Sequence, residues 1–246
     1  MKILVCVSKA PDTTTKIAFI DNDTKFNEDK VQYIVNPYDE WYALVRALEL
    51  KETLGGTVTT ITVGTVADEA IIRKAFAIGA DDGVRIDANP TDAFMVANEI
   101  ANYAKQNGFD LVLLGKETID YNGSQIGAMI AELMDLPFVS LATKLNVNGT
   151  TATVERDING GTEVLELSLP AVISSAKGMA EQRIPNMKGI MAARTKPLNV
   201  IAPGSQEALT EIKKYTLPPA KGACKMVDPD NMDELVSLLH NEAKAL

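Results

Sequence analysis

A glycine and a Gly-Ser pair, at a spacing suited to a phosphate, lie between a short apolar run and an amphipathic segment. The apolar run 111–114 ends at Gly115, a polar loop follows, and Gly123-Ser124 precede apolar residues at helical spacing. This order predicts a strand, a loop and a helix. The first N–H groups of a helix lack internal partners and lie at the positive end of its dipole, and glycine lets the backbone approach an anion. The stretch 110–129 therefore predicts a nucleotide-phosphate site; an ordinary capped helix start after a βα turn is the alternative.

Residues for other chemistries are scarce. The one histidine, His240, lies in a C-terminal amphipathic segment, and Cys6 and Cys224 have neither metal-ligand nor disulfide-framework spacing. Cys6 lies in an apolar run, where a buried thiol is the ordinary role. No dinucleotide fingerprint follows the first strand, and no Walker motif or nucleophile elbow occurs. We therefore expect no catalytic residues and no metal site.

Composition narrows the class of protein further. The chain has 246 residues, 46% of them hydrophobic and 23% charged, with a formal net charge of -9. This length and balance predict one or two globular domains, and the acidic charge without a basic stripe argues against broad nucleic-acid binding. The chain begins on a strand, without a signal sequence or a membrane-length apolar span, so we expect a cytoplasmic protein without membrane insertion.

Strands and helices alternate through the first half of the chain. Continuous apolar or β-branched runs predict strands, and apolar residues at helical spacing predict helices. The predicted strands are 2–8, 57–64, 84–86 and 110–115, and the predicted helices are 36–55, 67–78 and 91–107. This pattern predicts the α/β class, with a doubly wound, mostly parallel sheet of the adenine-nucleotide-binding, Rossmann-like kind. Ligands bind such sheets at the carboxyl ends of the strands, where the loop after Gly115 would lie.

Local signals also predict where these helices begin. Asn36 is a suitable N-cap and Pro37 a suitable first helical residue, and an ordinary helix start is the alternative to a ligand contact for this pair. Thr91 is the expected cap of a later helix. Alternating segments at 17–20 and 31–35 predict a hairpin insertion between the first strand and the first helix.

After residue 136 the pattern changes. Three alternating segments at 138–146, 151–157 and 162–167, joined by Asn-Gly turns, predict an antiparallel meander. Residues 169–174 then predict a strand that returns to the main sheet. Residues 1–200 form the expected nucleotide-binding domain, and residues 201–246 form a polar C-terminal arm that ends in a helix and either folds back or lies across a partner.

Several separate stretches resemble one known family. They are residues 4–8, 36–40, 71–81, 110–120, 154–161, 169–172, 181–185 and 190–197. In this order the chain resembles the β subunit of electron transfer flavoproteins over most of residues 1–200. The resemblance implies a heterodimer with a larger α subunit, which the C-terminal arm would contact. It also implies a structural AMP in the β subunit and a redox FAD held mainly by the α subunit.

The same resemblance implies a carrier and not an enzyme. The heterodimer would accept electrons from acyl-CoA and related dehydrogenases of fatty acid β-oxidation and pass them to a quinone oxidoreductase in the membrane. Some bifurcating members hold a second FAD in place of AMP, so both nucleotides stay open. The family loop carries more acidic residues where this chain has Tyr121 and Asn122. The residues that the resemblance places around the nucleotide are Cys6, Asn36, Pro37, Tyr38, Asp39, Val63, Gly115, Lys116, Glu117, Thr118, Ile119, Asp120, Tyr121, Asn122, Gly123, Ser124, Gln125 and Ile126.

The resemblance also implies a docking segment for dehydrogenases at residues 176–185. Met179 occupies the position of an apolar anchor, where many members have leucine, with Glu181 and Arg183 nearby. A methionine packed in its own core is the alternative. Asp157 aligns with an acidic residue that can pair with an arginine of the α subunit, although an aspartate before a turn needs no partner.

Two other adenine-nucleotide folds compete with this interpretation. A stand-alone ATP- or AMP-binding stress-type protein would have a second early glycine before Gly123-Ser124, and it would have neither the meander nor the arm. An ATP pyrophosphatase would have a Ser-Gly-Gly-x-Asp-Ser loop after the first strand, where this chain has residues 8–13, Ser-Lys-Ala-Pro-Asp-Thr.

Overall fold

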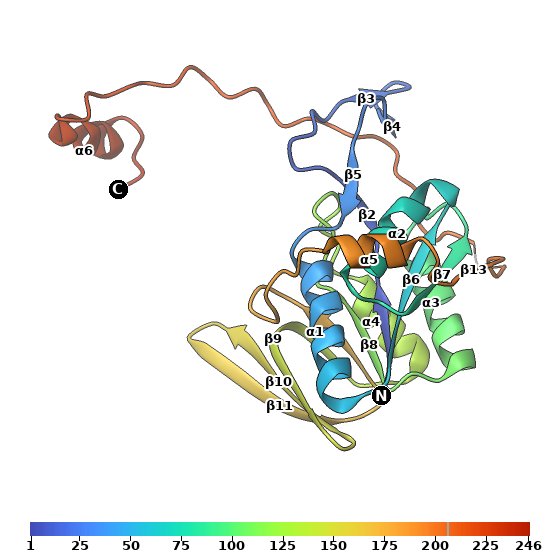
Figure 1. The fold of residues 1–246 in the computed structure, drawn as a ribbon. Coiled ribbons are helices and arrows are strands. Elements are labelled where there is room, and N and C mark those ends of the chain that lie inside the picture. Colours follow the sequence, from blue (N-terminus) through green and yellow to red (C-terminus); the bar gives the residue numbers. More distant parts are fainter. Residues whose placement is uncertain (206) are drawn as a thin grey trace.

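The computed structural model describes residues 1–205 and 207–246, and a nine-stranded sheet forms its centre. The strands are β1 Lys2–Cys6, β6 Thr57–Gly64, β7 Asp82–Asp87, β8 Leu111–Gly115, β9 Phe138–Asn148, β10 Thr151–Ile158, β11 Gly161–Ser168, β12 Ala171–Ser175 and β13 Leu198–Ile201. Their order is β11-β10-β9-β12-β8-β1-β6-β7-β13 (Figure 1). The strands from β9 to β13 along this order pair in parallel, which confirms the predicted mostly parallel sheet.

The central strand β1 fixes the register of the sheet. Ile3 pairs with Val58 of β6 on one side and with Leu111 of β8 on the other. In β6 every residue after Thr57 is buried, as expected of a parallel strand that is covered on both faces. The chain moves outward from β1 to β6 and β7, and then returns to β8 on the opposite side, so the direction of winding reverses beside β1.

Helices cover both faces of the sheet, which confirms the doubly wound arrangement (Figure 1). The first face has α1 Asp39–Leu54, α2 Glu69–Ile78 and α5 Met187–Ala193, and the second has α3 Ala93–Asn107 and α4 Ile126–Met134. A 3₁₀ turn, η1 Val66–Asp68, precedes α2. Each face has its own apolar core, with Phe76 fully buried in the first and Ile130 in the second. These cores hold the strand ends and helix starts in fixed positions.

Two predicted helix caps are wrong. The first helix is capped by Tyr38, whose φ of 66° is not helical, and Asn36 lies outside the helix because its side chain is bound elsewhere. The later helix is capped by Asp92 and not by Thr91, because the Asp92 carboxylate accepts from Met95 N–H at 2.7 Å.

The predicted hairpin insertion is paired differently. The short strand β3 Phe19–Ile20 pairs with β4 Lys25–Phe26, while β5 Tyr33–Val35 pairs with β2 Lys9–Pro11. The two predicted segments therefore belong to different two-stranded sheets. Residues 9–11, for which no strand was predicted, form the strand that pairs with β5.

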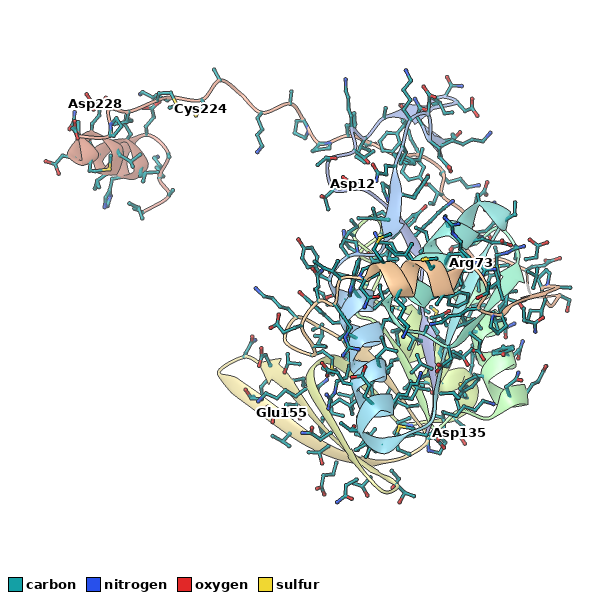
Figure 2. The ribbon with its side chains drawn as sticks, in the orientation of Figure 1. Asp12, Arg73, Asp135, Glu155, Cys224 and Asp228 are labelled. Atoms are coloured by element: carbon teal, nitrogen blue, oxygen red, sulfur yellow. The ribbon has the colours of Figure 1, made fainter. Side chains whose placement is uncertain are left out.

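The second half follows the sequence pattern closely. The strands β9, β10 and β11 form the predicted antiparallel meander, and β12 is the predicted returning strand. β13 adds a further parallel strand beside β7, which the sequence pattern did not predict. Beyond it the arm passes the β3–β4 hairpin and extends to α6 Met232–Asn241, and Figure 2 shows Cys224 and Asp228 far from the sheet.

Candidate functional site

The candidate site lies where the winding of the sheet reverses. The carboxyl ends of β1 and β8 are neighbours there, at Cys6 and Gly115, and β6 ends beside β1 at Gly64. Open parallel sheets bind ligands in the crevice at such a switch point. The polar loop 116–125 connects β8 to α4 at this crevice, as the sequence predicted.

Asn36 joins the first helix region to this loop. Its side chain is fully buried, and its Nδ2 donates to the carbonyl of Glu117 at 2.9 Å. Its Oδ1 accepts from the N–H of Ile119 at 3.0 Å. Both ends of the amide are therefore used, over 81 and 83 residues of sequence separation. Asn36 acts as a clamp on the loop, although local sequence favoured a helix start.

Gly115 allows the same two segments to approach closely. A Cβ atom at this position would lie 2.8 Å from the backbone nitrogen of Glu40 and 3.0 Å from Cβ of Asp39. These distances are shorter than a normal contact, and a backbone atom cannot move aside cheaply. The glycine that ends β8 therefore lets the start of α1 pack against the start of the loop.

The end of the loop presents unpaired backbone donors. In the part of the chain that the structure describes, the successive N–H groups from Gly123 to Ile126 have no hydrogen-bond partner. Gln125, the N-cap of α4, makes no side-chain capping bond. Gly123 is also open, because an added Cβ would meet nothing closer than 3.7 Å. Consecutive unpaired N–H groups that lead into a helix N-terminus are of the kind that bind anions, and we refer to these four groups as the nest.

Beside β1, the carboxyl group of Glu40 is almost wholly buried. It accepts from Ser8 N–H at 2.8 Å and pairs with the Ser8 hydroxyl at 2.7 Å. Burial raises the pKa of Glu40 to about 8, and the Ser8 bonds offset only part of this effect. Burial also raises the pKa of the Cys6 thiol, and the nearby Glu40 raises it further. Cys6 is therefore a protonated, apolar residue at the end of β1 and not a reactive thiolate.

Charged side chains also interact at the beginning of the loop. Burial raises the pKa of Asp39 to about 6, while Lys116 lowers it and Glu117 raises it. The Glu117 carboxylate lies 3.0 Å from Lys116 Nζ and accepts from the Ser124 hydroxyl at 3.0 Å. One carboxylate thus links the beginning of the loop to its end.

The structure brings the nucleotide-site residues of the resemblance to this one edge of the sheet. Cys6 and Val63 share the apolar core of the second face and are barely exposed. Tyr38 is 54% exposed and Tyr121 is 66% exposed, so these two rings lie at the rim. The sequence pattern does not predict the Ser8–Glu40 pair, because an acidic residue at the start of a helix has an ordinary role beside the helix dipole. Its position beside a buried strand end was the available signal.

The predicted docking segment 176–185 has both buried and exposed side chains. Met179 is 5% exposed and packs in the first-face core, which favours the alternative of a methionine in its own core; its role as a docking anchor stays a prediction. Arg183 makes a two-pronged pair with Glu52 of α1, at 2.6 and 3.2 Å, and so holds the segment against its own chain. Ile184 is 86% exposed, and Glu181 is exposed beside it.

Asp157 lies near the end of β10, just before the turn to β11. It is exposed and pairs across the strands with Thr162, whose hydroxyl lies 3.5 Å away. A local role therefore accounts for this residue, and its pairing with another subunit stays a prediction. Within residues 1–205 and 207–246 no cluster of three or more His, Cys, Asp or Glu could hold a metal ion. No helix in the described part of the chain could cross a membrane.

Comparisons with known proteins show the family of the chain. A family model described as "Electron transfer flavoprotein domain" matches residues 23–205. The chain is 36% identical to the electron transfer flavoprotein subunit beta of Bacillus subtilis (strain 168) over 261 residues, covering all of both chains. It is 39% identical over 226 residues to the subunit of the same name from Syntrophomonas wolfei, and this alignment covers 91% of the chain and 88% of the relative. It is 31% identical over 263 residues to the acryloyl-CoA reductase electron transfer subunit gamma of Anaerotignum propionicum, and this alignment covers 97% of the chain and 98% of the relative.

Proposed function

The chain belongs to the electron transfer flavoprotein family as a β-type subunit, and we propose that it forms a heterodimer with an α subunit and binds AMP in the crevice beside β1. In this role it carries electrons from acyl-CoA and related dehydrogenases to a quinone oxidoreductase. It works as a carrier subunit without an acid-base set of its own. A cytoplasmic location stays a prediction.

The nest of N–H groups from Gly123 to Ile126 carries the proposal of an AMP site. A phosphate group fits the nest because it can accept several N–H bonds at the positive end of α4. Cys6 and Val63 offer an apolar surface for the adenine at the ends of β1 and β6. The charged side chains at the start of the loop are Asp39, Lys116 and Glu117. Lys116 is the cation among them, and its charge favours the phosphate.

The chain contributes position and electrostatics to the electron transfer, and FAD supplies the redox chemistry when it is bound. Asn36 fixes the loop, Gly115 fixes the start of α1 against it, and the loop then shapes the edge that faces the partner subunit. The AMP has a structural role in this proposal, because it fills the crevice and pairs the loop donors. We assign the redox FAD to a site held mainly by the α subunit.

An electron-transfer assay tests this proposal. The heterodimer, produced with its α subunit, is mixed with an acyl-CoA, a catalytic amount of acyl-CoA dehydrogenase and no oxygen. The proposal expects the flavin absorbance near 450 nm to fall, and to recover when a quinone oxidoreductase and a quinone are added. Flavin that stays oxidised with every acyl-CoA and related donor tested would contradict the proposed electron donors.

A second candidate function comes from one relative. The Anaerotignum propionicum protein is named as an electron transfer subunit of acryloyl-CoA reductase. By analogy, the chain would deliver electrons to a reductase, with FAD in place of AMP if the complex bifurcates electrons. Reduction of the flavin by NADH, and not by an acyl-CoA donor, would favour this candidate.

A further inference from the structure

The C-terminal arm first runs along α3. Gly204 N–H donates to both carboxylate oxygens of Glu99, at 2.9 and 3.0 Å. Farther along the arm, the N–H groups of Leu209 and Thr210 donate to Asp92, at 2.7 and 2.9 Å. Asp92 and Glu99 are two helical turns apart in sequence, so they share one face of α3, about 10 Å apart along its axis. The arm therefore runs antiparallel to α3, toward the start of that helix.

The Asp92 carboxylate joins the arm to the first turn of α3. Its Oδ1 accepts from Met95 N–H at 2.7 Å and caps the helix. Its Oδ2 accepts the two arm N–H groups and the hydroxyl of Thr210, which lies 3.2 Å away. Hydrogen bonds to an ionised carboxylate are roughly twice as strong as bonds between neutral groups. One side chain therefore both starts α3 and holds the arm.

Beyond Thr210 the arm reaches the β3–β4 hairpin and then leaves the domain (Figure 1). The ring of Tyr215 stacks on Phe19 with centroids 4.7 Å apart, and Tyr215 N–H donates to the carbonyl of Asp23 at 2.7 Å. The hydrogen bonds and ion pairs of the described residues 216–246 join the arm only to itself. The contacts at α3 and at the hairpin therefore set the direction in which the rest of the arm extends.

The helix α6 at the end of the arm has an uncovered apolar side in the described part of the chain. Met232, Leu235 and Val236 recur at helical spacing and are all exposed, and no residue of α6 is buried. A helix of 10 residues is marginal in water on its own, and an apolar side is stabilised by packing against another surface. In the proposed heterodimer the α subunit is the partner that supplies this surface.

We propose that Asp92 is a positioning residue for assembly of the heterodimer, because it holds the arm on α3 and so sets where the arm leaves the domain toward the α subunit. This inference rests on the proposed heterodimer. An arm whose first part is already ordered loses less conformational entropy when its end binds a partner. Release of the arm from Asp92 therefore weakens the heterodimer, although Asp92 itself need not contact the α subunit.

Two substitutions separate the two roles of the carboxylate. In Asp92→Ser the hydroxyl can still cap α3, because serine is a good N-cap, but no second oxygen remains for the arm. Asp92→Asn keeps one oxygen and presents an N–H₂ group where the other oxygen accepted the arm donors. Asn186→Ser is the matched control, because Asn186 caps α5 through Gly189 N–H at 2.8 Å, on the other face of the sheet.

Each variant is purified as the heterodimer with the α subunit. The first readout is amide hydrogen exchange of residues 207–210, and the second is the rate at which the bound α subunit exchanges for labelled α subunit. Water can satisfy the freed arm N–H groups, so the expected loss is that of about one ordinary hydrogen bond, which makes both exchanges roughly 2- to 12-fold faster. The control should leave both rates unchanged. The amides of α3 should keep their wild-type exchange in Asp92→Ser, because the helix cap remains.

The possible failures can be told apart. Wild-type hydrogen exchange of residues 207–210 in both Asp92 variants would show that Asp92 does not hold the arm. A loosened arm with wild-type exchange of the α subunit would show that the contact does not serve assembly. Either result overturns this inference while the proposed function stands. If the wild-type chain forms no heterodimer with the α subunit, the proposed function fails and this inference fails with it.

Discussion

Replacing Asn36 by alanine tests the architecture of the nucleotide loop. The substitution removes the donor to the Glu117 carbonyl and the acceptor of the Ile119 N–H in one step. Asn36 lies outside α1 and is fully buried, so the substitution leaves the helix cap unchanged. The loop itself is partly exposed, and water can satisfy its two freed groups only when the loop opens. The expected result is therefore a loop that opens more often and holds its ligand less tightly.

The structure sets the size of this effect. A protein hydrogen bond contributes a net of about 0.5–1.5 kcal/mol, so the two bonds of Asn36 together contribute about 1–3 kcal/mol. If this free energy holds the closed loop, the affinity for AMP falls by a factor of roughly 5 to 150.

The assay is the exchange of bound AMP for labelled AMP in the heterodimer, together with thermal unfolding. Asn146→Ala is the matched control, because Asn146 is exposed and its side chain accepts one long hydrogen bond, from Arg46 at 3.4 Å. We expect the control to change stability by less than about 0.5 kcal/mol. Wild-type AMP retention in Asn36→Ala would show that the clamp does not support the nucleotide site.

Three further predictions follow from the same contacts. Gly115→Ala places a Cβ 2.8 Å from Glu40 N and should lower the unfolding free energy by roughly 1–3 kcal/mol in a denaturant titration; unchanged stability would contradict the close approach. Burial raises the pKa of Glu40 from its ordinary 4.5 to about 8, so the folded protein keeps a proton that the unfolded chain loses. The unfolding free energy of the protein should therefore fall as pH rises from about 5 to 8, by up to roughly 1.4 kcal/mol per pH unit. Unfolding measured at several pH values should show a smaller slope for Glu40→Gln, and an equal slope in both proteins would refute the raised pKa of Glu40. Ile184 is the exposed large apolar side chain of the predicted docking segment 176–185, so Ile184→Ala should weaken dehydrogenase binding in calorimetry without loss of stability. Met179→Ala should lower the unfolding free energy by about 2–5 kcal/mol; the reverse pattern would support Met179 as the docking anchor.

The alternating elements could be predicted because their signals are local. The run 57–63 is β-branched at every position and is followed by Gly64, and it became β6 with the predicted bounds. The Asn-Gly turns likewise marked the meander, since they join strands that are adjacent in sequence. The position of the loop 115–126 could be predicted because the carboxyl ends of parallel strands all lie at the same edge of the sheet.

The failures involve contacts between distant residues. Asn36 has the local signature of a helix cap, but its amide is bound by a loop 81 residues away, and no local propensity reports this. Met179 follows a strand and lies among polar residues, yet the first-face core accommodates its side chain. Strand pairing in the insertion also depends on which segments are close in space, since β5 pairs with β2 and β3 pairs with β4. Such contacts depend on tertiary packing, which overrides local preference.

The central claim is that the crevice beside β1 holds an adenine nucleotide while the redox flavin belongs mainly to the α subunit. The most direct test is to denature the purified heterodimer and to identify the released nucleotides by chromatography and by absorbance near 450 nm. We expect equal amounts of AMP and FAD, and we expect AMP to be lost in variants of the crevice beside β1. Two equivalents of FAD and no AMP would replace the AMP assignment by the bifurcating alternative, and a heterodimer without any nucleotide besides one FAD would contradict the site itself.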